Sequence, residues 1–239
     1  MKYLRLFQTV AERQAATLDY PNVNYTIEND SLEIIAEDPT PAFGGLTVKY
    51  NIVDATQEVT LFNGGGGSST SSSTSGSGSG SGGGGVLPSK MYVDGVEETP
   101  INTWRFETAG EHIVQYEFAD NIVPSKFLMN NPIYTEVIVG DDITDISSFA
   151  FYNENSEGIL TSVTIGTGIE SIDAQAFGSN VNMTSITIKT TTPPTLGRSA
   201  FDNTNDCPIY VPAESVNTYM TTPVTGWDSY TERIQAIQS

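Results

Sequence analysis

The sequence has only one cysteine, one histidine and ten basic residues among its 239 positions. Cys207 has no partner within the chain, so a fold stapled by intrachain disulfides is excluded. His112 has no second histidine with which to share a metal ion, and no nucleophile motif accompanies it. We therefore expect no enzyme: the sequence predicts no catalytic residue, no metal site and no cofactor.

The ten basic residues face 29 acidic ones, which gives a formal net charge of −19. Nucleic-acid binding depends on Lys and Arg that neutralise phosphates, and anionic membranes attract the same side chains. No window approaches the ~18 apolar residues of a membrane span. We expect neither a nucleic-acid partner nor insertion into a membrane.

Three acidic residues, Asp141, Asp142 and Asp145, lie close together in the sequence. Clustered carboxylates are ligands that calcium favours, but the spacing of an EF-hand loop is absent. The three fall in an expected turn between strands, where solvated acids are common. A solvated turn is the favoured interpretation.

A targeting segment is also missing. The first eight residues begin with a positive charge, but Arg5 and Gln8 interrupt them before an apolar stretch develops. This favours a protein that has no export signal of its own.

What the chain does contain is a pattern that returns every 23 to 26 residues. Each copy has a short alternating strand, one apolar residue further on, and an Ala-Phe pair that ends five positions after that residue. Full copies begin at Glu136, Ser162 and Ser185, a worn copy spans residues 114–128, and a half copy lies at residues 209–211. Such a period predicts a solenoid in which stacked repeats share one core. The expected solenoid core consists of Val137, Ile146, Phe151, Val163, Ile172, Phe177, Ile186, Leu196 and Phe201.

These copies resemble the leucine-rich repeats of the BspA-like family. Residues 160–165 and 169–177 match the family's repeat almost position for position, and residues 192–212 are similar to its closing repeat. The resemblance covers residues 113–239. It implies a surface for binding, with a host surface glycan or protein as a possible partner.

Residues 1–41 form a separate expected module. Thr9 and Glu12 make a capping box that predicts a helix over residues 10–18, and alternation over residues 23–27 and 32–35 predicts a hairpin. The module is either a docking segment or a hairpin folded on its own domain. It also resembles N-terminal segments of structural proteins in Bacteroides (crAss-like) phages. The candidate capsid-attachment residues are Lys2, Tyr3, Arg5, Phe7, Arg13 and Tyr25.

Short alternating segments over residues 42–118 predict a small β-sandwich. Residues 104–116 resemble the last hairpin of an immunoglobulin-like or PKD-like domain, and they run directly into the repeats. Residues 64–85 contain only Gly, Ser and Thr, a composition typical of a flexible coil. A natural loop insertion is favoured there over an artificial linker, and ordering against partner chains stays open.

The predicted fold class is mainly β, with an N-terminal helix-hairpin anchor (1–41), a small immunoglobulin-like β-sandwich (42–118) and a C-terminal leucine-rich-repeat solenoid (113–239). We favour a virion structural protein, a head fibre or capsid decoration protein that is made in the host cytoplasm and attached to the phage capsid by its N-terminus. The alternatives are a bacterial cell-surface adhesin and an accessory protein of a glycan hydrolase. A homo-oligomer, trimer or dimer, is expected.

Overall fold

The computed structural model describes residues 26–28, 31–33, 43–63, 87–154, 158–221 and 226–238. The chain divides into two units, Met1–Ala42 and Phe43–Ser239.

In the first unit, β1 (Thr26–Glu28) pairs antiparallel with β2 (Ser31–Glu33), with Ile27 opposite Leu32. The helix expected over residues 10–18 and the segment of residues 64–85 lie outside the described residues.

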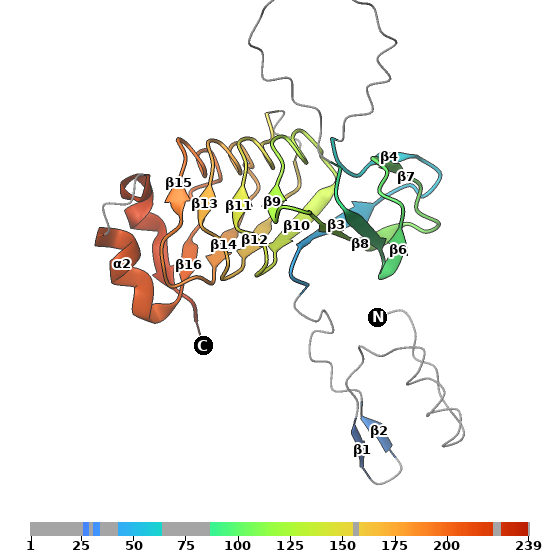
Figure 1. The fold of residues 1–239 in the computed structure, drawn as a ribbon, viewed down its shortest axis with the longest axis horizontal. Helices are drawn as coiled ribbons and strands as arrows, with labels where there is room; N and C mark the ends of the chain where they lie inside the picture. The colour runs from blue at the N-terminus through green and yellow to red at the C-terminus, as the bar shows by residue number, and fades with distance from the viewer. Residues whose placement is uncertain are drawn as a thin grey trace, which may run out of the picture. The chain divides into compact units, whose positions relative to one another are not determined.

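The repeats of the second unit place their strands side by side in two rows (Figure 1). Within each row, successive strands are parallel and in register, as the repeat spacing requires. The longer row contains β10 (Tyr134–Val139), β12 (Ser162–Ile165), β14 (Ser185–Ile188) and β16 (Ile209–Val211). The shorter row contains β9 (Ile122–Val123), β11 (Asp145–Ile146), β13 (Ser171–Ile172) and β15 (Thr195–Leu196).

The core lies between the two rows. Alternate residues of each strand point inward, and each of the three full repeats adds one phenylalanine from the turn after its short strand. Phe151 and Phe177 stack with 4.8 Å between ring centroids, and Phe177 and Phe201 with 5.7 Å. Because all three rings are fully buried, each repeat depends on its neighbours for its apolar contacts.

A strand from far upstream lies at the first end of the longer row. β3 (Leu46–Ile52) is antiparallel both to β10 and to β8 (Gly110–Glu117). In a solenoid of stacked repeats, the worn copy at residues 114–128 would lie directly on the first full repeat. Its short strand β9 does so, but its long strand lies on β8, one strand removed from β10.

The region before the repeats continues the same sheet. β5 (Lys90–Val93) and β6 (Val96–Glu98) extend it beyond β8, so that nine strands run in the order β17-β16-β14-β12-β10-β3-β8-β5-β6. A separate ladder joins β4 (Val59–Thr60) to β7 (Thr103–Trp104). An immunoglobulin-like sandwich is not confirmed, because most of its expected strands belong to the repeat sheet.

Short helices cover the C-terminal end of the repeats, where Figure 1 shows α2 beyond β15 and β16. These elements are η1 (Ala213–Ser215), α2 (Val216–Thr221) and η2 (Trp227–Arg233), and they lead into β17 (Ile234–Ala236), which pairs parallel with β16. The buried ring of Trp227 lies against Phe201 at 6.3 Å, and its indole N–H donates to the Pro194 carbonyl at 2.8 Å. The apolar end of the solenoid is thereby closed.

Candidate functional site

The residues expected to form the solenoid core are all at most 4% exposed, so they lie behind the surfaces that a partner could touch. These are Val137, Ile146, Phe151, Val163, Ile172, Phe177, Ile186, Leu196 and Phe201. The candidate attachment residues Lys2, Tyr3, Arg5, Phe7, Arg13 and Tyr25 lie outside the described residues. Candidate functional residues in the described part must therefore come from outward-facing positions.

The outward face of the longer row offers the most regular surface. Ile138, Thr164, Thr187 and Tyr210 lie opposite one another on β10, β12, β14 and β16, in one line across the sheet. Each alternates with a buried residue of its own strand, and each side chain is only partly buried. Neighbouring strands in a sheet are about 4.8 Å apart, so the line is an evenly spaced row of side chains.

A second row runs beside the first and consists of Glu136, Ser162 and Ser185. Its only acid, Glu136, forms an ion pair with Lys49 on β3, with 2.7 Å between Lys49 Nζ and Glu136 Oε2. The outward positions of β12 and β14 are therefore hydroxyl groups alone. On a chain with net charge −19, this face stands out as nearly neutral. We call the outward side chains of β10, β12, β14 and β16 the strand face.

Two acids of the cluster at residues 141–145, Asp141 and Asp145, accept hydrogen bonds from protein donors. The amide of Thr167 in the next repeat donates to Asp141 Oδ1 at 2.7 Å, and this hydrogen bond lowers the pKa of Asp141. The hydroxyl groups of Thr144 and Ser171 both donate to the carboxylate of Asp145. Among the described residues, no group of three or more His, Cys, Asp or Glu side chains could hold a metal ion.

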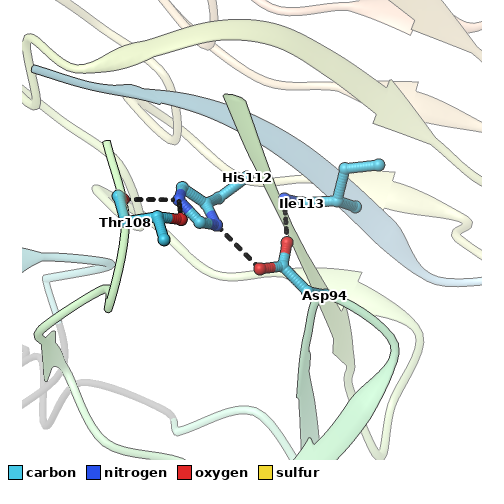
Figure 2. Close-up of polar contacts among 4 residues, drawn as sticks. All are labelled: Asp94, Thr108, His112 and Ile113. Atoms are coloured by element: carbon cyan, nitrogen blue, oxygen red, sulfur yellow. Dashed lines mark hydrogen bonds and ion pairs between the residues drawn. The ribbon is translucent and has the colours of Figure 1, made fainter. Parts of the chain in front are cut away.

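The single histidine lies between two oxygen acceptors (Figure 2). His112 Nδ1 is 2.7 Å from Asp94 Oδ2, and His112 Nε2 is 2.8 Å from the Thr108 carbonyl oxygen. The other oxygen of Asp94 accepts the Ile113 amide at 3.0 Å. These contacts tie the turn between β5 and β6, and the loop before β8, to the β8 strand.

An acid, a histidine and a hydroxyl residue recur in nucleophilic catalysis, so this group needs a geometric test. The Thr108 hydroxyl is 3.5 Å from His112 Nε2, at the outer limit of a hydrogen bond, while the carbonyl oxygen is closer. The ring is 4% exposed and stacks on Phe106 at 4.3 Å. The geometry suits a structural clamp, in which His112 Nε2 already faces the Thr108 carbonyl oxygen.

The described residues contain no helix long and apolar enough to cross a membrane. Two in-register parallel rows around a phenylalanine ladder define the protein as a solenoid of the leucine-rich-repeat class. Residues 100–221 match the family model for the BspA type leucine-rich repeat region, with 6 copies. The chain belongs to this family. No curated protein matches the chain significantly.

Repeats of this family suggest a module for adhesion to surfaces or for protein binding. The sequence predicted the strands, but it did not predict that Thr187 lies opposite Tyr210. The half copy at residues 209–211 lacks the rest of a repeat, so its register against the preceding repeat could not be aligned. The alternation of Ile209, Tyr210 and Val211 was the available signal.

Proposed function

We propose that this protein is an adhesion protein and that it contacts its partner through the strand face. The observation that carries the proposal is the register that brings Ile138, Thr164, Thr187 and Tyr210 into one line on four parallel strands. A nearly neutral surface suits contact with another macromolecule, because few charged groups need to be desolvated. Aromatic side chains on a surface, such as the partly exposed Tyr210, are enriched where proteins bind one another.

A binding role agrees with the chemistry of the rest of the molecule. The Asp94–His112–Thr108 group is arranged as a clamp, and the net charge of −19 opposes binding to phosphate backbones. Labelled full-length protein should therefore be retained on intact cells or on immobilised surface glycoproteins, without chemical change to them. Absence of retention on every surface tested would refute the proposal.

The setting that we propose is the surface of a phage capsid, with the protein acting as a head fibre or decoration protein attached by residues 1–38. Support comes from the separate N-terminal unit and from its basic residues, since three of the ten in the chain lie in its first 13 positions. The alternative is a bacterial cell-surface adhesin, which the repeat family supports equally well. Mass spectrometry of purified particles distinguishes the two, because only a virion protein co-purifies in fixed proportion to the capsid.

Attachment and assembly can be tested on the same material. Deletion of residues 1–38 should leave a folded protein that no longer binds capsids, and full occupancy by the truncated protein would refute attachment through this unit. We also propose a symmetric homo-oligomer, a trimer or dimer, since closed symmetry is usual for soluble assemblies. Light scattering of the full chain at micromolar concentration tests this, and a monomeric mass would contradict it.

A further inference from the structure

Each repeat turns after its short strand through one residue with a left-handed backbone. These residues are Lys126 (φ 61°), Phe149 (φ 62°), Gln175 (φ 54°) and Ser199 (φ 59°). Each precedes the buried pair whose second member, Leu128, Phe151, Phe177 or Phe201, fills the core. The four therefore occupy equivalent positions in successive repeats, and we call them the turn ladder.

The residue types on the turn ladder are unusual for this backbone. Left-handed φ angles cost free energy for residues with a Cβ, and Gly, Asn and Asp are the residues that normally adopt them. Elsewhere in the described chain most residues with positive φ follow this rule: Gly95, Gly110 and Gly226 do, as do six Asn or Asp residues, and Ser179 (φ 62°) is the exception. The turn ladder instead retains a lysine, a phenylalanine, a glutamine and a serine. Backbone strain of this kind concentrates at functional sites.

Successive residues of the turn ladder lie in neighbouring repeats that are hydrogen-bonded to each other. The Lys126 amide donates to the Ser148 carbonyl at 3.3 Å, the Phe149 amide to the Ala174 carbonyl at 3.1 Å, and the Gln175 amide to the Arg198 carbonyl at 3.0 Å. Each left-handed residue is thus bonded to the residue just before its counterpart in the next repeat. Lys126 and Gln175 consequently lie in the repeats on either side of Phe149, at the equivalent backbone position.

Phe149 belongs to an aromatic pair that no other repeat contains. Its ring meets that of Tyr152 edge to face, with 5.5 Å between centroids and 82° between planes, and both side chains are only partly buried. The next repeat has Gly178 beside Tyr152, and a Cβ there would lie 3.2 Å from the tyrosine ring. A glycine at position 178 therefore avoids crowding the Tyr152 ring. The turn-ladder residues of the two neighbouring repeats supply an exposed ammonium group, from Lys126, and an amide, from Gln175.

We propose that this aromatic pair, with Lys126 and Gln175 on either side, is a carbohydrate-binding site. A sugar ring has an apolar C–H face, which packs on aromatic side chains, and a rim of hydroxyl groups, which an ammonium group and an amide can bind. The formal net charge of −19 opposes binding of a polyanion, so the ligand is a neutral glycan. The site lies on the turns, apart from the strand face, and does not depend on it.

The test is binding of the full-length protein to three neutral polysaccharides, mannan, xylan and starch, with heparin as the anionic comparison. Phe149→Gly removes the ring and also relieves the backbone, so its melting temperature should stay close to that of the unchanged protein. Ser199→Gly makes the same backbone change at the last residue of the turn ladder and is the matched control. We expect binding to at least one neutral polysaccharide, a loss of tenfold or more with Phe149→Gly or Tyr152→Ala, and no loss with Ser199→Gly.

Three results would overturn the site: no binding to any neutral polysaccharide, binding only to heparin, or equal binding by Phe149→Gly. A large fall in melting temperature with unchanged binding would show that the ring is structural. Thr164→Arg on the strand face should leave polysaccharide binding intact. A failure of the proposed adhesion surface is therefore distinguishable from a failure of this site.

Discussion

The ring of Phe151 lies almost parallel to that of Phe177, with 4.8 Å between centroids and 8° between planes. The centroid spacing is the distance between neighbouring strands of a sheet, so the rings repeat with the backbone. Phe177 has a second ring, Phe201, on its other side at 5.7 Å. It is therefore the phenylalanine whose loss removes contacts from two repeats at once.

Phe177→Ala should lower the free energy of unfolding by about 3–5 kcal/mol, because it leaves a cavity at the centre of the stack. Thr164→Ala should change it by less than about 0.5 kcal/mol, since Thr164 lies on the outward face of β12. Chemical denaturation measures both. Equal losses at the two positions would contradict the register of the repeat strands.

Arg233 fastens η2 to the last repeat. Its guanidinium group donates to the Cys207 carbonyl at 2.8 Å, the Thr204 hydroxyl at 2.9 Å and the Phe201 carbonyl at 3.2 Å. The ammonium group of a lysine cannot donate to all three acceptors as the planar guanidinium group does. Arg233→Lys should therefore lower the free energy of unfolding by about 1–3 kcal/mol. The exposed Arg198→Lys is the control and should be neutral. An unchanged denaturation midpoint for Arg233→Lys would show that the end of the solenoid is held by apolar packing alone.

Asp94 combines a left-handed backbone, φ 50°, with hydrogen bonds to Ile113 and His112. Asp94→Ala should destabilise the protein by about 2 kcal/mol, and Asp94→Asn by less, because Asn tolerates this backbone and keeps an acceptor for Ile113. Thermal melts compare the two variants. The assignment of a clamp fails if both variants melt at the temperature of the unchanged protein.

Asp141 gives the protein a pH-dependent contact between repeats. Its pKa is lowered in the folded state by the hydrogen bond from the Thr167 amide, so the ionised form stabilises the fold. This contribution is complete above the ordinary carboxyl pKa of about 3.9 and is lost as the pH falls through the lower folded value. Asp141→Asn should therefore be less stable than the unchanged protein at pH 7, with the difference shrinking as the pH falls below the ordinary carboxyl value. A difference that persists in acid would contradict this assignment.

The repeat strands could be read from the sequence because two signals agree there. Alternation identifies a strand, and recurrence at a fixed period tells which strands are neighbours. The expected segments at Ser162–Ile165 and Ser185–Ile188 coincide with β12 and β14. Inward and outward positions follow from the alternation, so the strand face was implicit in the repeat.

The antiparallel neighbour of β10 could not be predicted in this way. β3 has the alternation of a half-buried strand, but alternation does not say which distant strand it pairs with. The same limit applies to the histidine clamp, because Asp94 and His112 meet only through the pairing of β5 with β8. The turn ladder is invisible to hydropathy, since its members share a backbone angle and no side-chain chemistry.

The most direct measurement of the central claim is the retention of labelled protein on intact bacterial and epithelial cells, compared between two double variants. Thr164→Arg with Thr187→Arg places two long cations on the strand face. Thr192→Arg with Thr195→Arg adds the same charge at exposed positions by the shorter row. We predict that the first variant loses retention at least tenfold at unchanged melting temperature, while the second binds like the original protein. Equal retention by both variants, or equal loss, would contradict adhesion through the strand face.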